Sequence, residues 1–229
     1  MMIWNIPNAL TIFRMLLVPV FVYFLLQEES RALIIAFIIF CTACFTDYLD
    51  GKIARSLNQR SEFGKFADPL ADKLLVAAAL ISFVLIPAIY IPLWMVLLIL
   101  VREVLVTWLR VFALRRHATV ETSFMGKSKT AAQMITITVI LILLIIQATF
   151  LENLSNAANA AHAPADILEF TALTTFAGTG SFWESYAGDA FWGKLLEALP
   201  LILMSITCFI TVYSGVFYLW VNRKFLGAQ

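Results

Sequence analysis

The stretch that decides the fold runs from Asp47 to Asp72 and reads DYLDGKIARSLNQRSEFGKFADPLAD. It follows the pattern D-x2-D-G-x2-A-R-x8-G-x3-D-x3-D, so four aspartates stand where two long apolar segments meet. A charged side chain near the centre of a membrane helix costs about 2.5–3.5 kcal/mol on insertion scales, so such a cluster indicates a functional site. The stretch predicts two helices joined by a short loop, with carboxylates that a divalent cation would stabilise.

The composition around this stretch is that of a membrane protein. Of the 229 residues, 62% are hydrophobic and 14% are charged, and the mean hydropathy is +0.89. Soluble domains carry about 25% charged residues, so a soluble fold is excluded. Apolar runs long enough to cross a bilayer occur at about 6–26, 32–50, 68–87, 92–114, 130–150 and 197–221. We expect an all-α bundle of six transmembrane helices.

The distribution of charge predicts how this bundle is oriented. Of the 16 lysines and arginines, only Arg31 and Lys194 fall on the side of the 27–31, 87–92 and 151–196 connections. Positive residues favour the cytoplasmic side, so we expect both termini and the aspartates at the cytoplasmic face. We expect one membrane domain, 1–229, with an extracytoplasmic loop insertion at about 151–196, where polar residues replace the apolar pattern.

The spacing of the aspartates has a helical meaning. Asp47, Asp50 and Ala54 are related as i, i+3 and i+7, which places them on one face if the helix continues past the apolar run. Asp68 and Asp72 are related as i and i+4 and share one face of the following helix. Two antiparallel helices would bring the two pairs of carboxylates together.

The start of the second helix stays open because of Pro69. Proline is tolerated in the first turn of a helix, which would place Asp68 at or near the N-cap, where backbone amides favour a carboxylate. If the helix begins near Phe63 instead, Pro69 should produce a kink.

The chemistry of the cluster favours hard divalent cations. Carboxylates without nearby histidine or cysteine ligands point to Mg²⁺, Mn²⁺ or Ca²⁺ rather than zinc, and four of them can hold two ions that neutralise a diphosphate. Gly51 and Gly64 leave room for a bulky group to approach the backbone. Arg55 lies one turn beyond Asp50 and is placed to reach phosphate oxygens. The pattern excludes an EF-hand, which needs acids at alternate positions before its glycine.

All eight positions resemble the motif of the CDP-alcohol phosphatidyltransferase family, and the resemblance covers about 6–150 and the last helix. It implies an integral membrane transferase that binds two Mg²⁺ or Mn²⁺ ions. The metal ligands would be Asp47, Asp50, Asp68 and Asp72, and Asp72 would also be the catalytic base. The CDP-lipid site would comprise Asp50, Gly51, Ala54, Arg55 and Gly64.

Three further segments narrow the resemblance. Residues 5–14 (NIPNALTIFR), the Arg102-Glu103 pair with Arg110, and residues 126–130 (GKSKT) resemble bacterial members that join sn-glycerol 3-phosphate to CDP-diacylglycerol and release CMP. Residues 126–128 do not form a P-loop, because Glu121 stands where that motif needs a glycine. We expect the acceptor phosphate to be bound by Arg110, Lys127, Lys129 and Arg102. Glu103 is expected to orient Arg102, since charges within a membrane pair with one another.

Other functions stay open at this point. The same chemistry could use inositol phosphate, serine or phosphatidylglycerol as acceptor, although the basic residues favour a phosphorylated one. An intramembrane prenyltransferase also uses aspartates and Mg²⁺, and a divalent-cation transporter would use intramembrane acids. The expected partners are both substrates and membrane lipids of the bacterial cytoplasmic membrane, with no nucleic acid. Whether the chain forms a homodimer stays open.

Overall fold

The protein is all-helical in the residues that the computed structural model describes, 6–57, 62–115, 125–160 and 190–221. These residues form six helices and no strand: α1 (Ile6–Leu25), α2 (Ser30–Leu57), α3 (Glu62–Leu85), α4 (Leu93–Arg115), α5 (Met125–Ala160) and α8 (Ala190–Val221). Each predicted apolar run corresponds to one helix, and α2, α3 and α5 extend beyond the apolar part. The all-α prediction is therefore confirmed for the described residues.

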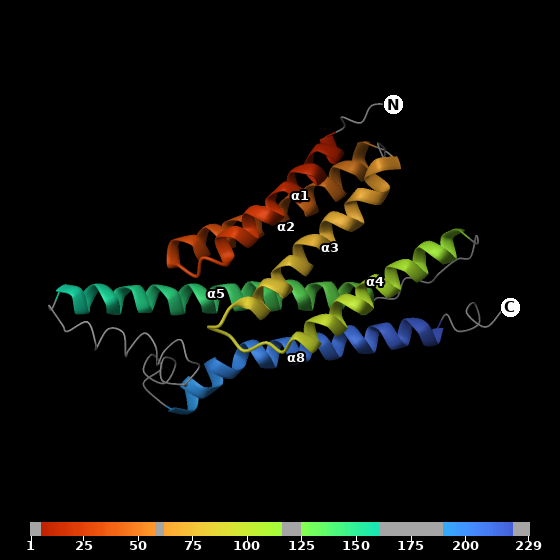
Figure 1. Ribbon diagram of the computed structural model, residues 1–229. Helices are drawn as coiled ribbons and strands as arrows, with labels where there is room; N and C mark the ends of the chain where they lie inside the picture. Colours follow the sequence, from red (N-terminus) through yellow and green to blue (C-terminus); the bar gives the residue numbers. More distant parts are fainter. Residues whose placement is uncertain (1–5, 58–61, 116–124, 161–189, 222–229) are drawn as a thin grey trace.

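The helices alternate in direction along the bundle (Figure 1). The start of α1, the α2–α3 hairpin, the end of α4, the start of α5 and the end of α8 lie at one end, which we call the hairpin end. The α1–α2 and α3–α4 connections, the end of α5 and the start of α8 lie at the other. This alternation is the one that the positions of the apolar runs predict.

The helices form two groups of three. In the first, α1 packs against both α2 and α3, and in the second, α8 packs against both α4 and α5. Contacts of α2 and α3 with α5, and of α3 with α4, join the two groups. A residue on the facing sides of α3, α4 and α5 thus lies at the junction between the two groups of helices.

Close packing inside the bundle depends on small and aromatic side chains. Ala36, Ala43 and Ala79 are fully buried, and small residues let membrane helices approach closely. Between them lie large buried side chains such as Phe21 and Phe83. Across α5 and α8 the hydroxyls of Thr136 and Thr207 are 2.7 Å apart and share a hydrogen bond.

The surface of the bundle is apolar over most helices. Large hydrophobic side chains on α1, α4 and α8 are more than half exposed, among them Leu16, Val104 and Phe209. Soluble monomers rarely expose such continuous apolar areas. Among the described residues, three segments are long and apolar enough to cross a membrane, and they are Ser30–Asp47, Lys129–Asn153 and Lys194–Val221. This is a membrane protein, and the count of six spans stays a prediction.

Two details of the helix bounds differ from expectation. The structure places 151–160 in α5 and 190–196 in α8, so the expected loop insertion is helical at both of its ends. Helix α3 begins at Glu62, more than a turn before Asp68. The N-cap alternative for Asp68 is therefore wrong, and Pro69 lies inside the helix.

Candidate active site

The aspartate motif lies on the helical hairpin that the sequence predicts. Helix α2 continues to Leu57, so Asp47, Asp50 and Ala54 share one helical face, and α3 carries Asp68 and Asp72 on one of its own. Gly51 and Arg55 also belong to α2, and Gly64 to α3. Of these eight residues, only Asp47 has its side chain within the described part of the structure, so the meeting of the two pairs stays a prediction.

Asp47 is held by a buried arginine of the first helix. Nη1 of Arg14 lies 2.5 Å from Oδ1 of Asp47. The Arg14 side chain is 1% exposed and that of Asp47 is 46% exposed, so the pair reaches from the interior to an accessible carboxylate. A guanidinium inside an apolar bundle needs such a partner. Since a carboxylate can accept about four hydrogen bonds, Asp47 retains capacity for a second cation.

A second group of charges lies at the junction of the two helix groups, and we call it the Glu103 cluster. Glu103 on α4 accepts a hydrogen bond from Nζ of Lys73 on α3 at 2.7 Å, and another from Nζ of Lys129 on α5. Nε2 of Gln133, also on α5, lies 3.3 Å from the same Oε1 that Lys129 contacts. Only 12% of the Glu103 side chain is exposed. One carboxylate thus ties three helices together.

The Glu103 cluster starts one residue beyond the aspartate motif. Lys73 directly follows Asp72 in α3, so the helix that carries the predicted base also carries a ligand of Glu103. Moving α3 along its axis would have to break this ion pair. The backbone position of Asp72 is therefore coupled to α4 and α5.

Arg102 belongs to the same cluster but points to another helix. Its Nη1 lies 3.8 Å from Oε1 of Glu103, while its Nη2 donates a hydrogen bond to Oγ of Ser214 on α8 at 2.6 Å. The expected pairing of Glu103 with Arg102 is thus present as an ion pair, and the same carboxylate also accepts hydrogen bonds from two lysines. Among the contacts described here for Arg102, the shorter one is the hydrogen bond to Ser214 on α8.

The four residues predicted to bind the acceptor phosphate divide into two pairs. Lys129 and Arg102 come together in the Glu103 cluster, and both side chains are 10% exposed. Arg110 lies in the last two turns of α4 and Lys127 in the first turn of α5, and their side chains lie outside the described part of the structure. Arg110, Lys127 and Lys129 lie toward the hairpin end of their helices, whereas Arg102 lies near the middle of α4.

The donor set of the motif fits a divalent cation. Among the described side chains, no group of three or more His, Cys, Asp or Glu residues forms a metal site, and three of the four predicted ligands lie outside that part. What the structure provides is a pair of continuous helices that carry two carboxylates each at helical spacing, with the Asp47 carboxylate accessible. Oxygen donors of this kind suit Mg²⁺ or Mn²⁺.

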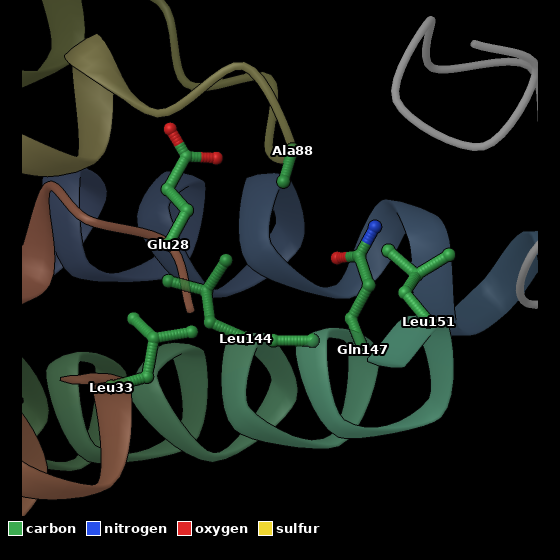
Figure 2. Close-up of a pocket in the computed structure, with 7 residues that line it drawn as sticks. Glu28, Leu33, Ala88, Leu144, Gln147 and Leu151 are labelled. Carbon is green, nitrogen blue, oxygen red and sulfur yellow. The ribbon is translucent and has the colours of Figure 1, made fainter. Parts of the chain in front are cut away.

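The hollow that the described side chains enclose is not part of this site. It lies at the end of the bundle opposite the hairpin, between Leu33, Leu144, Gln147 and the two connections that carry Glu28 and Ala88 (Figure 2). Its volume of about 20 Å³ is far below the roughly 300–1,000 Å³ of most ligand pockets. We assign it no role in the chemistry.

The family of the chain follows from comparison with known proteins. A sequence model of the CDP-alcohol phosphatidyltransferase family matches residues 4–165, and this chain belongs to that family. The match covers α1 to α5 and ends before α8, so the expected resemblance of the last helix lies outside it. Divalent metal ions are generally used in this family.

Individual relatives carry more specific names. A probable phosphatidylglycerophosphate synthase of Mycobacterium tuberculosis is 42% identical, over 58% of this chain and 64% of that protein. A CDP-diacylglycerol–glycerol-3-phosphate 3-phosphatidyltransferase of Bacillus subtilis is 40% identical, over 61% of this chain and 77% of its own length. The enzyme of the same name from Escherichia coli is also 40% identical, over 58% and 74%. The match thus spans less than two thirds of the mycobacterial relative.

Four residues at this site were not predicted from the sequence. Arg14 had a recognisable signal, since a cation inside an apolar run requires a partner. Lys73 next to Asp72 has the appearance of an ordinary helix-end charge. Gln133 on α5 and Ser214 on α8 had no signal in the sequence, because no local pattern specifies which helix each of them contacts.

Proposed function

We propose that this protein transfers the phosphatidyl group of CDP-diacylglycerol to sn-glycerol 3-phosphate, giving phosphatidylglycerophosphate and CMP. Family membership and the names of relatives at about 40% identity support this reaction. The observation that carries the choice of acceptor is the Glu103 cluster. Among the described side chains, three cations surround one carboxylate there, and an apolar bundle favours neutralising such an excess with an anion.

Each part of the site then has a task in the reaction. The acceptor hydroxyl attacks the β-phosphorus, its proton passes to Asp72, and the bond from that phosphorus to the CMP oxygen breaks. Asp47, Asp50, Asp68 and Asp72 would hold two Mg²⁺ or Mn²⁺ ions, which would neutralise the diphosphate and the departing CMP. The CDP-lipid site would comprise Asp50, Gly51, Ala54, Arg55 and Gly64.

The acceptor would bind on the side of the Glu103 cluster. Lys129 and Arg102 contribute charge from α5 and α4, and Arg110 and Lys127 would add to it from the hairpin ends of the same helices. A phosphate group suits such donors, because charge-assisted hydrogen bonds are about twice as strong as neutral ones. Serine carries no phosphate group and would therefore not use these donors in this way.

The proposed setting is the bacterial cytoplasmic membrane, crossed six times. Both termini and the hairpin end would face the cytoplasm, where the water-soluble acceptor is found, and 1–229 would form one domain with its extracytoplasmic connection at about 151–196. The alternation of the helices and the bias of positive charge support this orientation. The proposed partners are both substrates, membrane lipids and a second copy of the chain.

A direct test is release of CMP by the purified protein in lipid nanodiscs. We expect release from CDP-diacylglycerol with glycerol 3-phosphate, its loss with EDTA and its recovery when Mg²⁺ or Mn²⁺ is added back. Inositol phosphate, serine and phosphatidylglycerol are tested in parallel, and a prenyl diphosphate replaces the CDP-lipid in one arm. Arg31→Ala, which changes an exposed residue at the opposite end, is the matched control. CMP release with another acceptor but not with glycerol 3-phosphate would overturn the proposal.

A further inference from the structure

The last helix contacts the Glu103 cluster through two neighbouring residues. Oγ of Ser214 accepts the hydrogen bond from Nη2 of Arg102 at 2.6 Å. Ser214 is 5% exposed and the Arg102 side chain 10%, so this contact is made inside the bundle. The side chain of Arg102 therefore crosses from α4 to α8 before its guanidinium reaches the cluster.

Gly215 provides the space through which Arg102 crosses. A Cβ atom at this position would stand 2.9 Å from Cγ of Arg102 and 3.1 Å from its Nε. Carbon atoms that do not share a bond prefer about 3.5–4.0 Å, so even an alanine would push the stem of Arg102 aside. The absence of a side chain at Gly215 fixes the path of the arginine.

The position of this guanidinium matters for the charges around it. Its Nη1 is 3.8 Å from the Glu103 oxygen that also accepts from Lys129. A shift of the stem by less than an ångström would change how near the third cation stands to the two lysines. Interactions between charges depend steeply on distance where water is largely excluded.

We propose that Ser214 and Gly215 are positioning residues, which set the affinity of the site for a phosphorylated acceptor by fixing Arg102 beside Lys129. This inference rests on the proposed function and adds α8 to it. The family match ends at residue 165, whereas α8 comprises Ala190–Val221. A helix outside the matched region thus supports a cation of the acceptor site.

The test separates the KM for the acceptor from the other kinetic constants. Gly215→Ala is expected to raise the KM for glycerol 3-phosphate about tenfold, which corresponds to about 1.4 kcal/mol of binding, and to change the KM for CDP-diacylglycerol less than twofold. Ser214→Ala is expected to raise the acceptor KM about threefold. Val216→Ala, at an exposed position on the same helix, is the control and should leave both constants unchanged.

A double-mutant cycle with Arg102→Ala decides whether the effect passes through the arginine. Once Arg102 is removed, Gly215→Ala should change the acceptor KM less than twofold, because residues that act through one another are not additive. A further tenfold increase in that background would overturn the inference, as would an equal rise in both KM values. If Gly215→Ala does not fold, the same cycle with Ser214→Ala decides.

The two proposals fail in different ways. A parent protein that releases no CMP with glycerol 3-phosphate overturns the proposed function. An active parent whose Gly215→Ala and Ser214→Ala variants keep the parental acceptor KM overturns only the role of α8.

Discussion

Buried ion pairs are distributed unequally along the bundle. Toward the hairpin end, Arg14 reaches Asp47 from the interior, and in the middle of the bundle Glu103 binds lysines from two other helices. At the opposite end a hydrogen bond of 2.5 Å from Oγ of Ser30 on α2 to Oε2 of Glu152 on α5 joins an acid to a neutral hydroxyl, with no buried cation in the pair. Charges within an apolar bundle are costly, and they accumulate where chemistry requires them. The comparison predicts that substitutions of similar chemistry have large effects at one end and small effects at the other.

The largest expected effect is the loss of Asp68, a proposed metal ligand at the hairpin end. Asp68→Ala should lower CMP release by about a hundredfold or more, because even the partners of metal ligands are worth about 10–100-fold. The measurement is the rate of CMP release at saturating Mg²⁺ and Mn²⁺. Asp47→Ala and Asp50→Ala should behave alike. An active Asp68→Ala protein would remove this residue from the ligand set.

Replacing Glu103 or Glu152 by glutamine tests this comparison directly. Glu103→Gln leaves three cations without their carboxylate, and removing one partner of a buried ion pair costs about 3–5 kcal/mol. Glu152→Gln changes an exposed residue, and exposed interactions contribute about 0–1 kcal/mol. Thermal unfolding in one detergent should therefore show a much lower midpoint for Glu103→Gln alone. Equal midpoints would contradict the difference between the two ends.

Replacing Arg14 should change the Mg²⁺ concentration needed for CMP release more than it changes the structure of the CDP-lipid site. Arg14→Ala releases Asp47 from its partner, and loss of an outer-shell contact typically weakens a metal site by about 10–100-fold. The Mg²⁺ concentration for half-maximal CMP release should rise accordingly. Arg14→Lys keeps the charge and should lie between this variant and the parent. An unchanged Mg²⁺ requirement in Arg14→Ala would leave Arg14 with a packing role only.

The smallest effect is expected at Glu28, at the opposite end. Its φ of 55° is a left-handed conformation that costs a residue other than glycine about 1–2 kcal/mol, so Glu28→Gly should raise the unfolding midpoint slightly. Burial also raises the pKa of Glu28 above its ordinary value of 4.5.

The sign of the pH dependence follows from that shift. As the pH rises from below 4.5 through the raised value, the unfolded chain loses this proton first, so the folded state loses stability. Glu28→Gln should remove that loss and show its largest gain over the parent at neutral pH. A gain that is the same at low and neutral pH would contradict a role for the charge of Glu28.

Much of the fold could be predicted because apolar runs and helices coincide here. The longest difference at a helix end is that of α5, which continues to Ala160 although its apolar run ends near 150. Hydropathy reports which residues suit lipid, whereas leucine and alanine beyond Glu152 continue to favour a helix in water. The length of the connection was overestimated for this reason.

Only those parts of the site whose residues lie close together along the chain could be predicted from the sequence. The aspartate spacing has meaning within one or two helices, so its helical faces could be derived. The Glu103 cluster combines Lys73, Glu103 and Lys129 from three helices, and no local pattern specifies which helix faces meet. The same holds for Arg102, whose neighbour in sequence is Glu103 but whose hydrogen bond goes to Ser214.

The length of α5 has a consequence for how the protein sits in its membrane. Its 36 residues measure about 54 Å at 1.5 Å per residue, against a hydrocarbon layer of about 30 Å. A typical tilt of about 20° shortens this span by only a few ångströms, so α5 must extend past the lipid. Its polar last turns, from Glu152 to Ala160, lie mostly beyond the apolar span, which ends at Asn153.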